Sequence, residues 1–72
     1  MSFKDAQQYV GMECVVAWRA RRGDVQERKL FISDVTFVPQ YGICLITDYM
    51  EIRLDRVVSI RAAGEAAEPA AA

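Results

Sequence analysis

The chain contains no histidine, and its two cysteines and four glycines are scattered singly. Without histidine it lacks the commonest general base and the commonest metal ligand of proteins. Cys14 and Cys44 do not form the Cys-x-x-Cys pairs of a zinc site, and isolated glycines do not build a phosphate-cradling loop. We therefore expect no catalytic residue, no metal and no cofactor, and we interpret the protein as a non-enzymatic one.

Long apolar runs are also missing from the chain. No segment approaches the roughly 20 apolar residues that a membrane-spanning helix needs, and the N-terminus has no apolar stretch typical of a signal peptide. We therefore expect a cytoplasmic protein without membrane contact. In that compartment Cys14 and Cys44 are predicted to be reduced and buried in strands. A cross-strand disulfide between them is the alternative.

The net charge is close to zero, with nine basic and ten acidic residues. Two of the acids, Glu65 and Glu68, lie near the C-terminus, so residues 1–61 carry nine basic residues against eight acidic ones. This body lacks the overall positive charge typical of nucleic-acid-binding domains. A charged ligand would have to be held by a local patch.

A chain of 72 residues is expected to form one domain, which we assign to residues 1–61. Residues 62–72 consist of Ala, Gly, Glu and Pro and contain no large apolar side chain. Because burial cannot offset their ordering entropy, these residues are predicted to be a disordered tail. The core of so short a chain is small, which makes a homo-oligomer one expected means of stabilisation.

The N-terminal residues have the pattern of a short helix. Ser2-Phe3-Lys4-Asp5 resembles a capping box, and Phe3, Ala6 and Val10 recur at helical spacing. Gly11 then offers a stop. We predict a helix over about 3–10 that docks through Phe3 and Val10, since a helix of two turns is not stable alone.

Alternating apolar residues predict strands over 12–21, 25–38 and 43–47. Gly23 supplies the positive φ of the first turn, and 39–42 form the next one. Ser33-Asp34 interrupts the alternation of the long strand, which indicates a bulge or a sharp bend. After a turn over 48–51, two very short strands at 52–54 and 57–60 flank Asp55-Arg56, where a tight or 3₁₀ turn is expected.

These elements predict a mainly β protein, a small five-stranded, strongly bent barrel of the SH3 or Sm type with a short N-terminal helix. The strand alternation assigns to its core Cys14, Val16, Trp18, Leu30, Ile32, Val35, Phe37, Cys44, Ile46, Ile52, Leu54, Val57 and Ile60.

Most of the basic residues concentrate around the first predicted hairpin, and these binding candidates are Arg19, Arg21, Arg22, Arg28 and Lys29. Their number suffices for two to four phosphate contacts or for docking an acidic partner. Asp24 and Glu27 lie among them, and their negative charges weaken the positive electrostatic potential of this cluster. The alternative is a solvated hairpin tip that resists aggregation.

Two tyrosines in predicted turns, Tyr41 and Tyr49, are the other binding candidates. Turn tyrosines can stack on bases or anchor a protein interface, although they also cover barrel ends. Phe31 is expected to be exposed, because it alternates with Leu30 and Ile32.

The segment Glu51-Ile52-Arg53-Leu54-Asp55-Arg56-Val57-Val58-Ser59-Ile60, with residues 44–47 before it, resembles the C-terminal half of the Rof-like inhibitors of the Rho termination factor. Those proteins carry a similar "x-L-R-L-D-K-I-x-S-F" ending. The plan of a short helix and a bent barrel also resembles Sm-like proteins, including the Hfq class. The chain departs from both families, because its body is not acidic like a Rof-type inhibitor and it lacks the Lys-His of the Hfq class. The resemblance implies a small bent barrel and a regulatory role through contact with a protein. No binding-site residue of either family is transferred to this chain.

Three functions follow as hypotheses. The first is a regulatory binding module that acts on transcription or RNA machinery by docking on a protein. The second is an Sm-like barrel that binds RNA or DNA through the arginine hairpin. The third is a small structural or assembly subunit that oligomerises through exposed edge strands.

Overall fold

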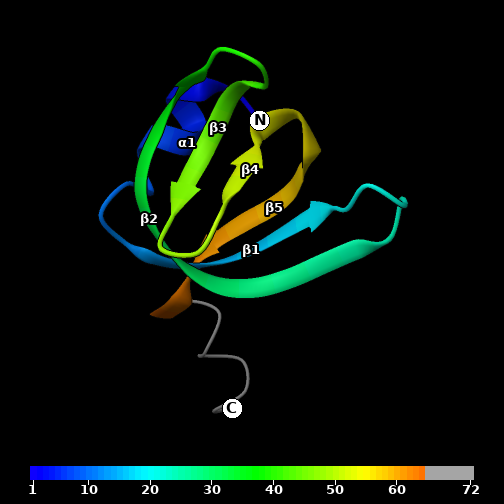
Figure 1. Cartoon of the computed structure of the whole chain (residues 1–72). Coiled ribbons are helices and arrows are strands. Elements are labelled where there is room, and N and C mark those ends of the chain that lie inside the picture. Colours follow the sequence, from blue (N-terminus) through cyan, green and yellow to red (C-terminus); the bar gives the residue numbers. More distant parts are fainter. Residues whose placement is uncertain (65–72) are drawn as a thin grey trace.

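The computed structural model describes residues 1–64 and consists mainly of one antiparallel sheet with a short helix (Figure 1). The sheet has five strands in the spatial order β4-β3-β2-β1-β5, so the predicted mainly β class is confirmed. The elements in chain order are α1 (Phe3–Gln7), β1 (Glu13–Arg19), β2 (Val25–Val38), β3 (Gly42–Thr47), β4 (Glu51–Arg53), the 3₁₀ turn η1 (Leu54–Arg56) and β5 (Val57–Ala62).

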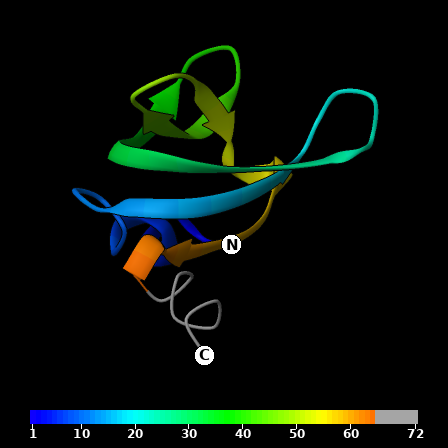
Figure 2. The same ribbon diagram turned by 90° about the horizontal axis from the view of Figure 1, so that it is seen from below.

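The long strand β2 bends so that it serves both halves of the sheet. Its first half pairs with β1 and its second half with β3. The register shifts between Ile32 and Asp34, where the Ser33 hydroxyl donates to the Ile46 carbonyl at 3.0 Å. The bulge predicted at Ser33-Asp34 is therefore confirmed. Figure 2 shows the result, with β3 and β4 stacked over β1 and β5.

Two predicted turns also have the expected geometry. Gly23 adopts a φ of +97° between β1 and β2, a conformation that costs glycine little and other residues much. Between β4 and β5 the chain turns through η1 without glycine, and the Val57 N–H donates to the Leu54 carbonyl. This 3₁₀ turn lets two very short strands follow one another directly.

The core lies between the two halves of the sheet and the helix. Trp18 and Val57, two predicted core residues, are half-buried and pack against it. The buried members of the cluster are Ala6, Cys14, Val16, Leu30, Ile32, Val35, Leu45, Ile52, Leu54 and Ile60.

The core prediction for β3 is confirmed for Cys44, which is buried, and wrong for Ile46. Leu45, not Ile46, pairs with Val35 and Ile52, and Leu45 is fully buried. Ile46 is half-buried and shares the outer face with Cys44, which is buried but lies outside the core cluster. Residues 43–46 are all apolar, so alternation carried no information about which face is inward.

Three more predicted core contacts are wrong. Phe37 is 62% exposed, because it lies at the end of β2 beyond the packed region. Phe3 and Val10 are also exposed. The helix is shorter than predicted and docks instead through Ala6, with Tyr9 packing beside it. Its N-cap is as expected, since the Asp5 N–H donates to the Ser2 hydroxyl at 3.1 Å.

The last strand extends one residue past the predicted domain boundary. Ala62, assigned to the tail from the sequence, pairs with Cys14 in β5. The rest of the predicted tail from residue 65 onward lies outside the described residues. Within residues 1–64, no helix has the length and apolar character that a membrane crossing requires.

Candidate binding surface

The predicted basic cluster does not form one patch. In the β1–β2 register Arg28 lies opposite Val16, and Lys29 lies opposite Val15. Successive residues of a strand point to opposite faces, and Val16 belongs to the core while Val15 does not. Arg28 therefore points to the inner side of the hairpin, and Lys29 points to the outer side.

On the outer face, two exposed ion pairs neutralise much of the charge. Lys29 lies 3.6 Å from Glu13, and Arg61 of β5 lies 3.7 Å from Glu27. Each pair contributes little stability because it is exposed. Both basic side chains nevertheless have an acid beside them, so this face offers little net attraction to a polyanion.

At the hairpin tip the arginines are exposed, as predicted. The Arg19 guanidinium donates to the Gly23 carbonyl at 2.8 Å and so helps to close the turn. Arg21 and Arg22 follow directly in the loop. Figures 1 and 2 show this tip projecting beyond the body of the sheet.

Among the basic binding candidates, Arg28 contacts one of the two tyrosine candidates, Tyr49. Its guanidinium carbon lies 5.2 Å from the centroid of the Tyr49 ring. Thr47 builds the turn that presents Tyr49: its hydroxyl donates to the Met50 carbonyl at 2.7 Å and accepts from the Met50 N–H at 2.9 Å. Tyr49 itself remains 72% exposed.

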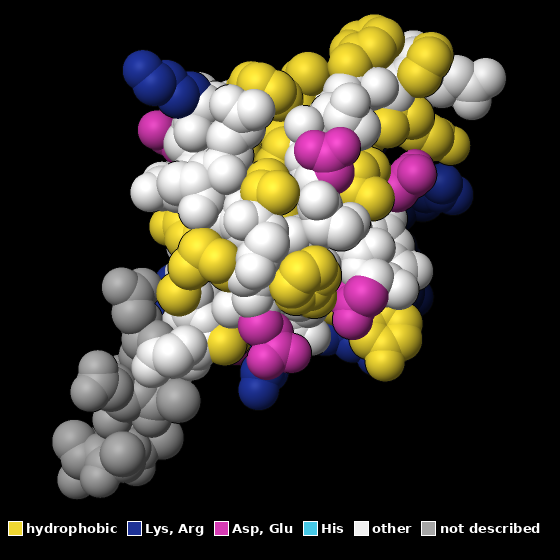
Figure 3. All heavy atoms as spheres, turned by 90° about the vertical axis from the view of Figure 1, so that its left-hand side faces the viewer, with side chains coloured by type: hydrophobic (Ala, Val, Ile, Leu, Met, Phe, Trp, Pro, Cys, Tyr) yellow, Lys and Arg dark blue, Asp and Glu magenta, His cyan; other side chains and the backbone are white. Residues whose placement is uncertain are grey.

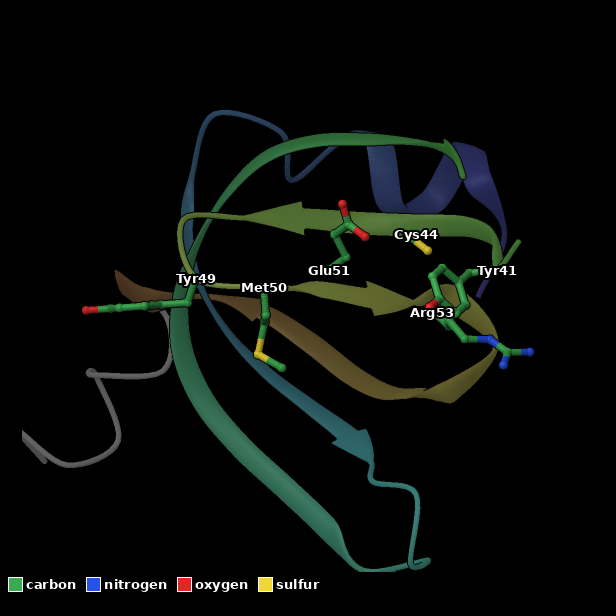
Figure 4. Close-up of a pocket in the computed structure, with 6 residues that line it drawn as sticks. All are labelled: Tyr41, Cys44, Tyr49, Met50, Glu51 and Arg53. Atoms are coloured by element: carbon green, nitrogen blue, oxygen red, sulfur yellow. The ribbon is translucent and has the colours of Figure 1, made fainter. Parts of the chain in front are cut away.

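Three adjoining hollows surround the end of β4. The first, of about 480 Å³, holds both tyrosine candidates, and it is lined by Tyr41, Cys44, Tyr49, Met50, Glu51 and Arg53. Figure 4 shows Tyr41 and Arg53 at one end of this hollow and Tyr49 at the other. Tyr41 and Tyr49 therefore lie along one side of the molecule, but not next to each other.

The second hollow, of about 450 Å³, is lined by Arg19, Arg53, Asp55, Arg56, Val57 and Val58. Strand pairing explains its composition. Trp18 pairs with Val57, which brings the neighbouring Arg19 close to Arg56 across the sheet. Arg53 at the end of β4 donates to the Asp55 carboxylate at 3.1 Å.

The third hollow, of about 350 Å³, is mostly apolar and is lined by Met1, Phe3, Tyr41, Gly42, Ile43, Leu54 and Asp55. Phe37 lies directly opposite Ile43 on the neighbouring strand and extends this apolar area. Figure 3 shows hydrophobic side chains at the upper end of one face of the molecule, and further ones scattered lower on the same face.

The three hollows share residues and form one continuous surface. Tyr41 lines the first and the third, Arg53 the first and the second, and Asp55 the second and the third. We call the lining residues of these hollows, together with Phe37, the Tyr41–Arg53 surface. Of the candidates from the sequence, Tyr41, Tyr49 and Arg19 belong to it, Arg28 contacts it through Tyr49, and Arg21, Arg22 and Lys29 lie elsewhere.

Sequence reasoning did not select Arg53, Arg56, Phe3 or Phe37 for this surface. Arg53 and Arg56 gather there because β5 turns back through η1 to pair with β1, a contact between distant parts of the chain. The one available signal was the charged Asp55-Arg56 pair in a turn without glycine.

The two cysteines do not add a nucleophile to this surface. Both are free and buried. Burial raises the pKa of the Cys44 thiol, and the negative charge of Glu51 raises it further. Burial and the charge of Glu13 likewise raise the pKa of Cys14. Both thiols are therefore protonated at neutral pH and unreactive. Within residues 1–64, no three side chains of the metal-binding types come together to hold an ion.

Comparison of the chain with protein-family models, with curated proteins and with solved structures finds no match.

Proposed function

We propose that the protein is a small, non-enzymatic regulatory module that docks on a protein partner through the Tyr41–Arg53 surface. The observation that carries this proposal is the gathering of exposed aromatic residues around adjoining hollows: Phe3 is 41% exposed, Tyr41 is 51% exposed and Phe37 is 62% exposed. Clustered exposed apolar side chains mark interaction sites on soluble proteins.

The composition of the surface favours a protein over other ligands. Tyrosine and arginine are enriched among the residues that dominate the binding energy of protein interfaces, and here Tyr41 and Arg53 each line two hollows. Apolar and charged areas lie beside each other, as in interfaces that have an apolar centre and a polar rim.

The binding of RNA or DNA has weaker support in this arrangement. Nucleic acid needs cations spread along its phosphate backbone. Here Lys29 and Arg61 are paired with acids, Arg28 faces the inner side of the hairpin, and Arg21 and Arg22 line none of the three hollows. A second copy of the chain is a further candidate partner, because β4 and β5 are edge strands with one neighbour each.

The proposal extends to the architecture. The bend of β2 at its bulge and the 3₁₀ turn between β4 and β5 support a small barrel of the SH3 or Sm kind. The resemblance of residues 44–60 to Rof-like proteins supports a role in transcription or RNA metabolism through protein contact.

The test is affinity capture from the native host with tagged wild-type protein and two variants, after nuclease digestion. Tyr41→Ala removes an aromatic residue from the surface. Phe31→Ala is its matched control, because Phe31 is also 41% exposed but lies opposite Glu13 on the outer face of the hairpin.

For the protein captured by the wild type, Tyr41→Ala should weaken binding about thirtyfold, the loss typical of a dominant interface residue. Phe31→Ala should bind like the wild type. Loss of the partner on nuclease treatment, or equal losses in the two variants, would show the proposal to be wrong. Light scattering of the purified chain separates self-association from capture of a different protein.

A further inference from the structure

The second hollow, lined by Arg19, Arg53, Asp55, Arg56, Val57 and Val58, has more positive charge than the protein itself balances. We call it the arginine hollow. Three guanidinium groups line it against a single carboxylate, that of Asp55. Asp55 is already bonded to Arg53, so most of the charge of Arg19 and Arg56 has no acid beside it within the hollow.

The arginines also have hydrogen-bond donors to spare. Each guanidinium carries five N–H donors in a planar fork. Arg53 gives one terminal nitrogen to Asp55, but its Nε is buried and has no partner among the described residues. Arg19 gives one terminal nitrogen to the Gly23 carbonyl. An oxyanion in the hollow would accept from the remaining terminal N–H groups of these arginines, whereas the buried Nε of Arg53 lies out of its reach.

Arginine forks match flat or tetrahedral oxyanions, which accept two parallel N–H bonds. The chemistry of the hollow therefore selects a carboxylate or a phosphate. Its size and surroundings favour the carboxylate of a peptide. The adjacent third hollow is apolar and shares Asp55 with it, so an occupant that fills both must combine an oxyanion with apolar side chains.

A nucleic-acid backbone fits less well, because it would need further cations in line with the hollow. Lys29 and Arg61 do not line the hollow and are paired with Glu13 and Glu27 on the outer face.

We propose that the arginine hollow binds a carboxylate side chain from an acidic segment of the partner protein, whose apolar residues occupy the third hollow. This inference rests on the proposed function and adds the chemistry of the partner to it: an acidic peptide with a neighbouring aromatic or aliphatic side chain.

The experiment uses the full chain and NMR spectra of the arginine Nε–Hε groups. The probe is a short blocked peptide containing several glutamates and one phenylalanine. The same peptide with glutamine in place of glutamate, an oligothymidylate of similar length, and inorganic phosphate are the comparison ligands. The Arg56 Nε–Hε signal is the most direct reporter, because Arg56 lines this hollow and neither of the other two.

The glutamate peptide should shift the Arg53 and Arg56 signals in a saturable manner, and its affinity should fall as salt is added. The glutamine peptide should leave these signals in place. Arg56→Ala should weaken binding of the glutamate peptide about tenfold, the loss expected for one charge-assisted hydrogen-bonding partner. Arg22→Ala, which removes an equal charge from the hairpin tip, should have no effect.

Arg56→Lys keeps the charge and removes the fork, and it should give a partial loss even if the alanine variant folds poorly. If Arg22→Ala and Arg56→Ala weaken binding of the glutamate peptide equally, the binding comes from the overall positive charge and not from the arginine hollow, which would overturn the proposal. Tighter binding of oligothymidylate or of free phosphate at the same arginine signals would also overturn it, in favour of those ligands. If the Arg56→Ala variant captures the partner and the Tyr41→Ala variant does not, the proposal for the arginine hollow is wrong. The proposed function is then still supported.

Discussion

The guanidinium of Arg28 lies over the ring of Tyr49, 5.2 Å from its centroid, and joins the projecting β1–β2 hairpin to the β3–β4 turn. Asp48 of the same turn is also bonded to Phe31 of β2: its N–H donates to the Phe31 carbonyl at 3.2 Å and its carboxylate accepts from the Phe31 N–H at 3.2 Å. The cation–π contact therefore adds to an existing link between β2 and the turn that carries Tyr49.

Replacement of Tyr49 by leucine should lower the free energy of unfolding by about 0.5–1 kcal/mol, the usual size of an exposed cation–π contact. Tyr49→Phe keeps the aromatic face and should change little. Urea denaturation of Tyr49→Leu, Arg28→Ala and the double variant measures the coupling energy. A coupling energy of zero would show that the two residues do not stabilise one another.

The two neighbouring residues Leu45 and Ile46 should differ sharply in their effect on stability. Leu45→Ala should cost about 2–5 kcal/mol, because Leu45 is fully buried in the core. Ile46→Ala should cost clearly less, because Ile46 is half-buried on the outer face. Thermal and urea unfolding measure both. A larger loss for Ile46→Ala than for Leu45→Ala would contradict the observed orientation of β3 and support the face predicted from the sequence.

The hydroxyl of Thr47 should be required for the β3–β4 turn. Thr47→Val keeps the shape of the side chain but removes its bonds to Met50 and Tyr49, and it should cost about 1 kcal/mol, because the half-buried Met50 N–H loses its acceptor while the Met50 carbonyl keeps the Thr47 N–H. Thr36→Val, at an exposed position of β2, is the control and should be nearly neutral. If both variants unfold at the same urea concentration, the hydroxyl network does not support the turn.

Alkaline pH should destabilise the protein through its thiols. Burial raises the pKa of both Cys14 and Cys44 above the ordinary value of 9.0, so the folded state keeps protons that the unfolded state releases. The thiols therefore have no effect on stability well below pH 9.0 and lower it as the pH rises past that value. Urea unfolding over this range should show a steeper alkaline decline for the wild type than for a variant with Cys14→Ala and Cys44→Ala. Parallel declines would contradict the cause assigned to the shifts.

Local signals predicted much of the fold. Strand β2 has the bounds that the sequence indicated, since Gly23 and Pro39 mark turns on either side of it, and Ser33-Asp34 marked its bulge. The turn at Asp55-Arg56 was also readable. The orientation of β3 was not, because an unbroken apolar run does not distinguish its two faces.

The candidate site was harder to predict than the fold, for a similar reason. Closeness in sequence suggested one basic cluster, but Arg28 and Lys29 are neighbours on a strand and so face opposite sides. The gathering of Arg19 with Arg53 and Arg56 depends on the pairing of β1 with β5, which no local pattern reports. The exposure of Tyr41 and Tyr49 could be predicted from their positions in turns, because connecting segments run over the protein surface.

The central claim, that a protein docks on the Tyr41–Arg53 surface, is tested most directly by photo-crosslinking inside cells of the native host. A photoreactive phenylalanine analogue replaces Tyr41 in one variant and Phe31 on the outer face of the hairpin in another. The account predicts a discrete crosslinked protein from position 41, lost when Arg53 is also changed to alanine, and none from position 31. Crosslinking of position 41 to nucleic acid, or equal crosslinking of the same protein from both positions, would contradict it.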